Sequence, residues 1–389
     1  MSFWKNIRAV AAREIETFKK RPVYFLGSVG VISFCAVFFL TFFGDGLPHD
    51  LPIGVVDNDN SSMSRQFSRQ LDATQLGRTV KFDTFADARL AMQRGDIYAI
   101  CVIPRDMYAD VSANRQPVFT YYINGMYFLG GSLSYKDILT MINLTNGAVQ
   151  RKVLRAKGVN EDQIMGRIKP VQVDTHQIGN AYTSYNYYIS NMMLPAILEM
   201  IVVILLIYSL GSELKYGTSR HLLRTGGGSI VTALGGKLLV YTALFTAIGM
   251  SLVFLLYDWL HFPIAGSVWN MFPAIILMIL ASEAVAIFII GCLPVPRLAL
   301  SIGALYSVLA ISFAGFTLPI EAMHPAIRGL AQAFPLRHYF IIYTHEVILG
   351  SGAAAWWPEA IHLMLFQFLP LAVMLRLKKA YIYQNYPKE

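Results

Sequence analysis

Residues 23–43 read VYFLGSVGVISFCAVFFLTFF and contain no charged side chain. About 20 apolar residues in a helix cross the hydrocarbon core of a bilayer, so Val23–Phe43 predicts a transmembrane helix. Further runs of this kind follow only after a long polar stretch, at Leu194–Leu210, Leu234–Tyr257, Met271–Cys292, Leu298–Leu318 and Pro358–Leu377. The polar stretch is long enough to form a domain. The sequence therefore predicts an α-helical polytopic membrane protein with six transmembrane helices and one large inserted domain.

The composition supports a membrane protein. Of 389 residues, 55% are hydrophobic and 14% are charged, whereas soluble domains carry about 25% charged residues. A net charge of +8 could indicate nucleic-acid binding, but much of it stands beside the apolar runs, as in Lys19–Arg21 and Lys378–Lys379. Basic residues in such places are typical of cytoplasmic loops. We therefore expect contact with membrane lipid and none with nucleic acid.

The basic residues also predict the topology. Those of the N-terminal segment, Lys215–Arg224, Lys237, Arg297 and Arg376–Lys379 fall on one face of the six predicted spans, and this face is expected to be cytoplasmic. An even number of spans places both termini there and the inserted domain outside. The predicted parts are an amphipathic interfacial connecting helix at 1–21, the first span at 22–43, an extracytoplasmic domain at 44–190, spans two to six at 191–377 and a cytoplasmic tail at 378–389.

The inserted domain alternates strand and helix patterns. Strands are predicted at Ile53–Val56, Thr79–Phe82, Ile97–Val102 and Val118–Tyr122, and helices at Ser61–Leu71, Phe85–Gln93, Arg105–Val111 and Leu133–Lys157. Such alternation favours a small α/β domain. Cys101 is the only cysteine in this stretch, so the domain must fold without an internal disulfide.

The motifs for nucleotide and metal chemistry are incomplete. Gly236-Lys237 resembles the end of a phosphate-binding loop, but Val231 occupies the first glycine position and Leu238 the hydroxyl position. Asp57-Asn58-Asp59-Asn60-Ser61 resembles the start of a calcium loop, yet Ser68 stands where the bidentate acid belongs, and a strand leading into a capped helix explains it more simply. The eight histidines show no pair at metal-ligand spacing. We expect no catalytic residue, metal or cofactor on this chain.

Two acidic residues, Glu199 and Glu283, lie within apolar runs. An ionisable side chain at membrane depth is costly, so each should face protein or water. Each could line a translocation path or a proton-linked site, or could instead make an interhelical hydrogen bond. For Glu283, which stands mid-span, the two interpretations are equally open. Glu199 lies nearer the outer boundary, which favours the structural one.

The loop after the second span is rich in charge. Its first part is Glu213-Leu214-Lys215-Tyr216-Gly217-Thr218, and Ser219-Arg220-His221-Leu222-Leu223-Arg224 follows. A short charged helix here could dock a soluble partner. Alternatively, the basic residues could do no more than set the topology.

Three segments together resemble the type-2 ABC transporter permeases, in the branch with a large extracytoplasmic domain between the first two spans. Val55–Arg65 is similar to the opening strand and helix of that domain, and Glu213–Leu223 to the coupling helix, expected near 212–227. Gly315–Pro325 with Phe334-Pro335-Leu336 is similar to the external loop after the fifth span. The resemblance covers nearly the whole chain, although Arg224-Thr225-Gly226-Gly227-Gly228 replaces the usual Thr-Pro type of turn.

The resemblance implies a permease subunit that is not itself an enzyme. It implies pairing with a second permease copy, identical or paralogous, and a separate ABC ATPase subunit that binds the ATP. The residues expected to couple to the ATPase are Glu213, Lys215, Gly217, Thr218, Arg220, Leu222 and Leu223. Those expected in an external re-entrant loop are Gly315, Phe316, Pro319, Pro325 and Pro335. The implied location is a bacterial inner membrane, with a periplasmic adaptor and an outer-membrane channel as further potential partners.

The implied function is export of an amphipathic or hydrophobic substrate, and two other classes stay open. An ion-coupled secondary transporter would use Glu283, but it should show more acids or broken helices at mid-span. A membrane-anchored receptor would bind an envelope partner through the external domain, but a single span would suffice for it.

Overall fold

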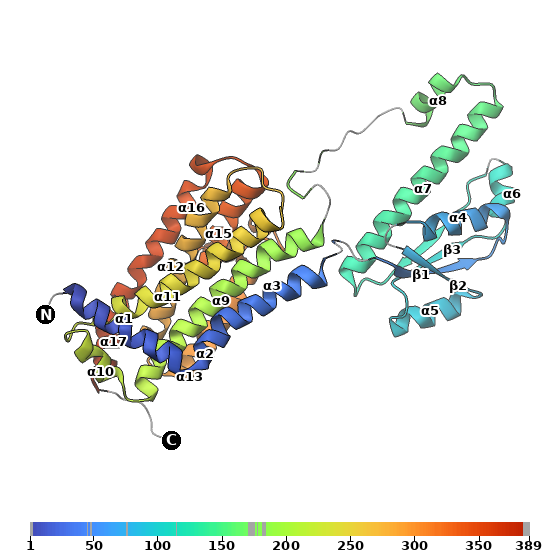
Figure 1. Cartoon of the computed structure of the whole chain (residues 1–389). Helices are drawn as coiled ribbons and strands as arrows, with labels where there is room; N and C mark the ends of the chain where they lie inside the picture. Colours follow the sequence, from blue (N-terminus) through green and yellow to red (C-terminus); the bar gives the residue numbers. More distant parts are fainter. Residues whose placement is uncertain are drawn as a thin grey trace. The chain divides into compact units, whose positions relative to one another are not determined.

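The computed structural model describes residues 3–44, 46, 49–74, 77–113, 115–169, 176, 178–180 and 184–383. The chain forms two compact units (Figure 1). The helical unit comprises Met1–Gly44 and Gln177–Glu389, and the inserted unit comprises Asp45–His176.

Six helices are long and apolar enough to cross a membrane, so the predicted number is confirmed for the described residues. The first, Pro22–Phe42, joins α2 (Pro22–Phe25), a π-helical turn at Leu26–Gly30 and α3 (Val31–Phe42). The others are α9 (Tyr185–Lys215), α11 (Ile230–Val253) with a π-helical turn at Phe254–Trp259, α12 (Val268–Cys292), α13 (Pro296–Phe313), and α16 (Ala353–Leu365) joined by a 3-10 turn at Phe366–Phe368 to α17 (Leu369–Tyr383).

Helices α9 and α12 form the centre of the helical unit. In their most apolar stretches 72% of the residues are buried, against 22–28% in the other four spans. Both α12 and α13 pack on α9, and α11 and α17 pack on α12. The outer spans leave large apolar side chains exposed, such as Phe34, Phe42, Leu305 and Leu375. A lipid environment would cover these side chains.

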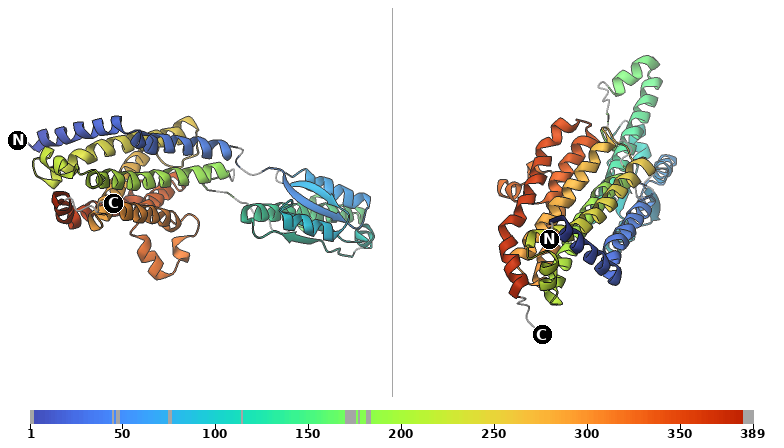
Figure 2. Two further views of the ribbon diagram at one scale, coloured as in Figure 1. Left: turned by 90° about the horizontal axis from the view of Figure 1, so that it is seen from below. Right: turned by 60° about the vertical axis from the view of Figure 1, so that its left-hand side comes forward.

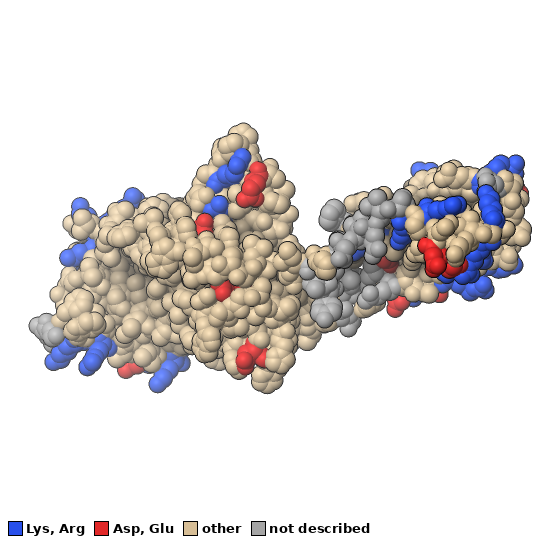
Figure 3. Space-filling model, turned by 90° about the horizontal axis from the view of Figure 1, so that it is seen from above, with Lys and Arg blue, Asp and Glu red and all other residues tan. Residues whose placement is uncertain are grey.

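Helices α1 (Phe3–Lys20) and α10 (Ser219–Thr225) lie at one end of the helical unit, together with the last turns of α17 (Figures 1 and 2). On the face drawn in Figure 3, Lys and Arg side chains gather at this end, and a broad belt with few charged residues lies beside it. We call the surface of α1, α10 and the last turns of α17 the basic end. α1 packs along α11 with one face buried.

The segment between α13 and α16 is largely helical. It contains a 3-10 turn at Ile320–Ala322, α14 (Pro325–Ala331), α15 (Pro335–Tyr343) and a π-helical turn at Thr344–Ile348. α14 and α15 each start with a proline. The first residue of a helix has no intrahelical acceptor for its amide hydrogen, so proline, which lacks that hydrogen, fits this position. α15 packs against α12, α13 and α16. The loop predicted here is therefore a packed helical segment.

The inserted unit is built on a four-stranded sheet in the order β2-β1-β3-β4. Strands β1 (Leu51–Asp57), β2 (Gly77–Phe82) and β3 (Ala99–Ile103) are parallel, and β4 (Thr120–Ile123) runs antiparallel to β3. One face packs against α4 (Ser62–Asp72), α6 (Met107–Ser112) and α7 (Phe128–Ala156), and the other against α5 (Phe85–Arg94); α8 (Glu161–Ile168) follows α7. The predicted α/β fold is confirmed.

The acidic run after β1 forms a turn. Asp57 Oδ1 accepts hydrogen bonds from the amides of Asp59 and Asn60, both at 3.0 Å. Its Oδ2 accepts from Ser64 Oγ at 2.7 Å. Ser61 caps α4, as predicted, because its Oγ accepts from the Ser64 amide at 3.0 Å. The run therefore joins a strand to a capped helix.

Several predicted boundaries shift in the helical unit. α9 begins at Tyr185 rather than Leu194, because Ser184 caps a first turn of tyrosine and asparagine that hydropathy alone does not mark. α13 ends at Phe313, before the predicted Leu318. The following glycine, at 315, has φ +96°, a left-handed conformation that commonly follows the end of a helix.

The outer limits of the predicted parts also differ. The compact inserted unit ends at His176, short of the predicted 190, since the last residues before the second span belong to α9. α17 continues to Tyr383, into the stretch 378–389 that was expected to be a tail. Residues 384–389 of that stretch lie outside the described residues.

Candidate functional site

Four charged side chains meet inside the basic end. Arg13 of α1 donates two hydrogen bonds to Glu213 of α9, from Nη1 to Oε1 at 2.9 Å and from Nη2 to Oε2 at 2.8 Å. Lys237 of α11 donates from Nζ to Glu213 Oε1 at 3.0 Å and to Glu14 Oε2 of α1 at 2.7 Å. We call these four residues the charge cluster. Lys237 and both glutamates are almost completely buried.

Hydroxyl groups satisfy the remaining carboxylate oxygens. Tyr241 OH and Ser209 Oγ donate to Glu14 Oε1 at 2.9 and 3.1 Å. Thr218 Oγ1 donates to Glu213 Oε2 at 2.5 Å. Because two positive charges face two negative ones, the desolvation penalty of each buried ion is offset by its partners. The charge cluster therefore fastens α1, α9 and α11 to one another.

Helix α10 is fastened to α17 beside this cluster. Ser219 Oγ donates to the carbonyl oxygen of Tyr381 at 2.9 Å, and Arg220 Nε donates to that of Ile382 at 2.7 Å. The two leucines of α10 are buried against the bundle. The exposed residues of the segment are Lys215, Tyr216, Gly217, Arg220, His221 and Arg224. The basic end thus has a polar outer surface on a rigidly held helix.

The predicted coupling residues fall into an outer and an inner group. Lys215, Gly217 and Arg220 are exposed. Glu213 and its partner Thr218 point into the charge cluster, and Leu222-Leu223 forms the buried side of α10. A soluble partner could touch only the first group directly, and the second would hold that surface in place.

The other members of the charge cluster do not stand out in the sequence. Glu14 follows Val10 by one helical turn and so lies on the buried face of α1. Lys237 lies seven positions after the start of the membrane-length helix Ile230–Trp259. No sequence pattern around it points to α1. Glu14 is an acid on the buried face of a helix, and Lys237 is a lysine inside a span. These two features are the signals from which an ion pair between them could have been predicted.

The two intramembrane acids occupy separate sites. Glu283 Oε2 accepts a hydrogen bond from Thr242 Oγ1 of α11 at 2.6 Å, and its Oε1 has no hydrogen-bond partner among the described residues. Neither oxygen of Glu199 has such a partner in the described part of the chain, although Ser307 of α13 is its polar neighbour. Both side chains are buried, on α9 and α12. Glu199 is therefore the less satisfied of the two.

The residues predicted for the external loop stand at the ends of elements and do not converge on one site. Phe316 accepts a hydrogen bond at its carbonyl oxygen from Tyr188 OH at 2.8 Å. Pro319 precedes the 3-10 turn, and Pro325 and Pro335 begin α14 and α15. Gly315, two residues after the end of α13, adopts a positive φ. These residues shape the segment between the fifth and sixth spans.

A residue outside the predicted set, Glu346, joins this segment to two spans. Its Oε1 accepts from the Ser267 amide at 2.7 Å and from Asn270 Nδ2 at 3.0 Å, both at the start of α12. Its Oε2 accepts from Trp356 Nε1 of α16 at 2.8 Å. Burial by itself would raise the pKa of Glu346, but these hydrogen bonds hold the pKa below the ordinary value of a glutamate.

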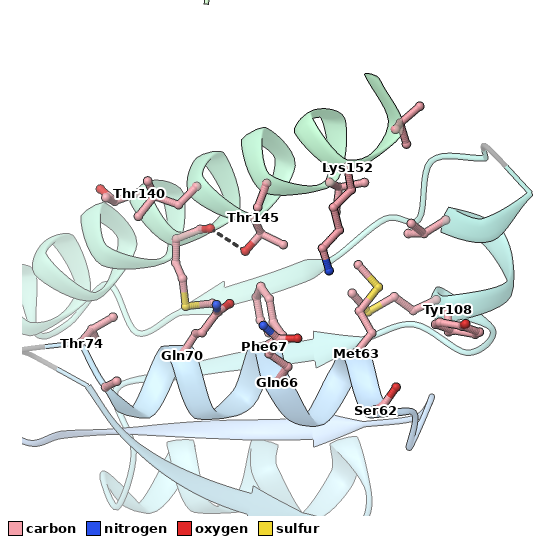
Figure 4. A pocket seen from close by; sticks show the side chains of 18 of the residues that line it. Ser62, Met63, Gln66, Phe67, Gln70, Thr74, Tyr108, Thr140, Thr145 and Lys152 are labelled. Carbon is pink, nitrogen blue, oxygen red and sulfur yellow. Dashed lines mark hydrogen bonds between the residues drawn. The ribbon is translucent and has the colours of Figure 1, made fainter. Parts of the chain in front are cut away.

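A groove of about 880 Å³ lies between α4, α6 and α7 of the inserted unit (Figure 4). Its apolar lining includes Met63, Phe67, Met107, Met141, Leu144 and Val149, and its polar lining includes Gln66, Gln70, Thr140 and Thr145. Lys152 of α7 points its ammonium group into the groove and makes no hydrogen bond or ion pair with the described residues. The groove thus offers an adaptable apolar wall and one unpaired positive charge.

Comparison with known proteins identifies the family of this chain. The sequence model of a family described as "ABC-2 family transporter protein" matches residues 24–376, a range that begins in the first span and ends midway along α17. No curated protein matched the chain. Proteins of this family form the membrane component of an ABC transporter and work with an ABC ATPase. Because the match covers most of its length, the chain belongs to the ABC-2 transporter family and is a multi-pass membrane permease.

Proposed function

We propose that this chain is the permease subunit of a bacterial ABC exporter. It would lie in the inner membrane with both termini in the cytoplasm and the inserted unit outside. A second permease copy, identical or paralogous, would complete the transport path. Further partners compatible with this location are a periplasmic adaptor and an outer-membrane channel. The substrate would be amphipathic or hydrophobic, and a separate ABC ATPase would supply the energy, since the phosphate-binding motif at Gly236-Lys237 is incomplete.

The charge cluster is the observation that carries the proposal, because it gives a physical route from an ATPase to the spans. The ATPase would dock on the exposed side of α10 and α1. Its closure on ATP would move that surface. Glu213 belongs to α9 and Lys237 to α11, so the motion would pass to whole helices rather than to a loop. The result would be a rigid-body switch between inward-open and outward-open states.

The intramembrane acids fit a polar lining of the transport path. Glu199 is the stronger candidate, since both its oxygens lack a hydrogen-bond partner among the described residues, whereas one oxygen of Glu283 is bonded to Thr242. In an exporter driven by ATP, Glu283→Gln should leave the ATP dependence of transport intact. An ion-coupled transporter would instead lose its dependence on the proton gradient in this variant and would work without ATPase.

The groove of the inserted unit supports an amphipathic substrate that carries an anionic group. Such a molecule would place its apolar body against Met63, Met107 and Met141 and its charge at Lys152. Lys152→Glu should weaken binding of an anionic amphiphile such as a fluorescent fatty acid at least about tenfold, because repulsion replaces attraction. Arg89→Glu, an exposed reversal on α5, is the matched control. Equal binding by both variants would exclude this site.

The function itself is tested by reconstitution. The full chain is placed in liposomes with an ABC ATPase that co-purifies with it, and accumulation of fluorescent amphiphiles is followed with and without ATP. The proposal expects transport only with ATP and only with the ATPase present. Transport driven by a proton gradient in the absence of the ATPase would contradict it.

A further inference from the structure

Three potential metal ligands converge between α15 and α16. His338 of α15 is fully buried, and its Nδ1 lies 2.5 Å from Glu359 Oε2 of α16. His362, one turn after Glu359, has its Nδ1 3.8 Å from the same oxygen and 2.9 Å from the carbonyl oxygen of Pro358, which leaves Nε2 as its free nitrogen. The two imidazole rings are stacked with centroids 5.0 Å apart. One ligand atom from each residue lies within 4.8 Å of the other two.

The hydrogen-bond pattern requires a positive species between His338 and Glu359. His338 Nε2 lies 3.0 Å from the carbonyl oxygen of Gln332. A carbonyl only accepts, so Nε2 must carry the hydrogen. A neutral ring then directs the Nδ1 lone pair at a carboxylate oxygen, which is also an acceptor. Either a proton or a metal ion has to separate the two atoms.

We propose that His338, Glu359 and His362 bind a divalent transition-metal ion, with Zn²⁺ as the first candidate. Two histidines and one carboxylate form a known type of zinc ligand set. Ligand atoms about 2.0–2.1 Å from a tetrahedral ion lie roughly 3.3 Å apart. The 2.5 Å between His338 Nδ1 and Glu359 Oε2 is shorter than this value, so an ion would push the two atoms apart. His362 would bind through Nε2, or its Nδ1 would have to leave the carbonyl oxygen of Pro358.

The surroundings favour a metal in two further ways. The bond between His338 Nε2 and the Gln332 carbonyl is the outer-shell contact that orients metal-binding histidines and leaves Nδ1 free to bind. Both histidines also line a cavity of about 460 Å³ between α12, α13, α15 and the sixth span. The cavity leaves room for a fourth ligand, such as water, at the ion.

One nearby charge opposes the ion. Arg337 is buried, and its positive charge acts on Glu359 while its Nη1 donates to Gln332 Oε1 at 2.5 Å. A second cation beside Glu359 therefore meets repulsion, and we expect weaker binding than at a fully enclosed structural zinc site. A bound ion would fasten α15 to the start of the sixth span.

The spacing of these residues carried a signal in the sequence. Glu359 and His362 stand three positions apart and so share one helix face. The third ligand, His338, lies on another helix, and only the packing of α15 on α16 brings it close. This is why the histidines look scattered along the chain.

The test uses the purified full chain in detergent. The protein is treated with a chelator, dialysed against ZnCl₂ and analysed for bound zinc by mass spectrometry, and Co²⁺ replaces Zn²⁺ for absorption spectra. We expect one ion per chain and the visible bands of tetrahedral Co²⁺. His362→Gln, which changes a half-exposed side chain, should lower the zinc affinity at least about tenfold. His338→Gln should abolish binding.

His261→Gln is the matched control, because His261 is exposed and makes no hydrogen bond recorded for the described chain. This variant should bind zinc as the wild type does. The proposal is overturned if the wild type holds no stoichiometric zinc, or if His362→Gln binds it with unchanged affinity. In either case a proton alone separates His338 from Glu359.

Discussion

Lys237 is the residue on which the charge cluster depends most, because it alone contacts both glutamates. Lys237→Met would leave a net negative charge buried beside Arg13. Breaking a buried ion pair in this way costs roughly 3–5 kcal/mol, so thermal unfolding of the purified protein should begin at a clearly lower temperature. Lys215→Met, an exposed change on the end of α9, should have little effect. Equal melting of the two variants would show that the cluster does not hold the helices.

Glu346 makes the stability of the folded protein depend on pH. Its folded-state pKa lies below the ordinary value, so its contribution is complete above the unfolded pKa of about 4.3 and is lost as the pH falls through the folded pKa. At pH 7, Glu346→Gln should lower the free energy of unfolding by roughly 1–3 kcal/mol. The unfolding temperature should fall accordingly. The melting temperatures of both proteins should converge as the pH falls below the folded-state pKa of Glu346, which lies below its unfolded value. A constant gap at all pH values would contradict this role.

At the scale of single residues, the sequence predicted positions better than partners. The sequence singled out the charged segment Glu213–Arg224 and the acids Glu199 and Glu283, and both acids are buried in the structure. That Glu213 faces inward was not predictable, because its partners lie 200 and 24 positions away, in α1 and α11. Contacts between residues so distant in the chain leave no periodic pattern.

The contact between α1 and α11 depends on one glycine. A Cβ at Gly236 would lie 2.6 Å from Val10 Cβ and 2.7 Å from the Ile7 carbonyl oxygen, so the helices would have to separate. Gly236→Ala should therefore destabilise the protein by roughly 1–3 kcal/mol. The neighbouring Gly235→Ala is an internal control, since its Cβ meets only Ile7 Cδ1 at 4.0 Å. It should be neutral or slightly stabilising. The same loss of stability in both would mean that helix propensity, not packing, decides.

At the scale of helices and strands, local sequence patterns predicted which elements form better than they predicted where the elements begin and end. The cap at Ser61, the alternation of strands and helices and the number of spans all follow from patterns within one segment. The true start of α9 at Tyr185 was not predictable, because its first turn is polar and hydropathy does not mark it. The short helix α15 was not predictable either, because it is held by packing against α12, α13 and α16.

At the scale of the whole molecule, the sequence predicted one span, an inserted α/β unit and five further spans, and the structure agrees. The family match confirms that the chain is an ABC-2 permease. The placement of α9 and α12 at the centre was not predictable, since all six spans are apolar and hydropathy does not distinguish a neighbouring helix from lipid. Nor does the sequence show that the α1, α9 and α11 helices form one block.

The central claim is that the basic end receives an ABC ATPase and passes its motion to the spans. Arg224 tests it cleanly, because the side chain is exposed and no hydrogen bond or ion pair of the described chain involves it, whereas Glu213 belongs to the buried cluster. The decisive measurement is the amount of ABC ATPase that co-purifies with the full chain carrying Arg224→Glu together with His221→Glu, compared with Arg89→Glu in the inserted unit.

The double variant should keep its melting temperature but retain at least about tenfold less ATPase, which corresponds to about 1.4 kcal/mol or more of lost binding free energy. Arg89→Glu should retain the ATPase as the wild type does. Undiminished ATPase on the double variant, with the fold intact, would contradict the claim.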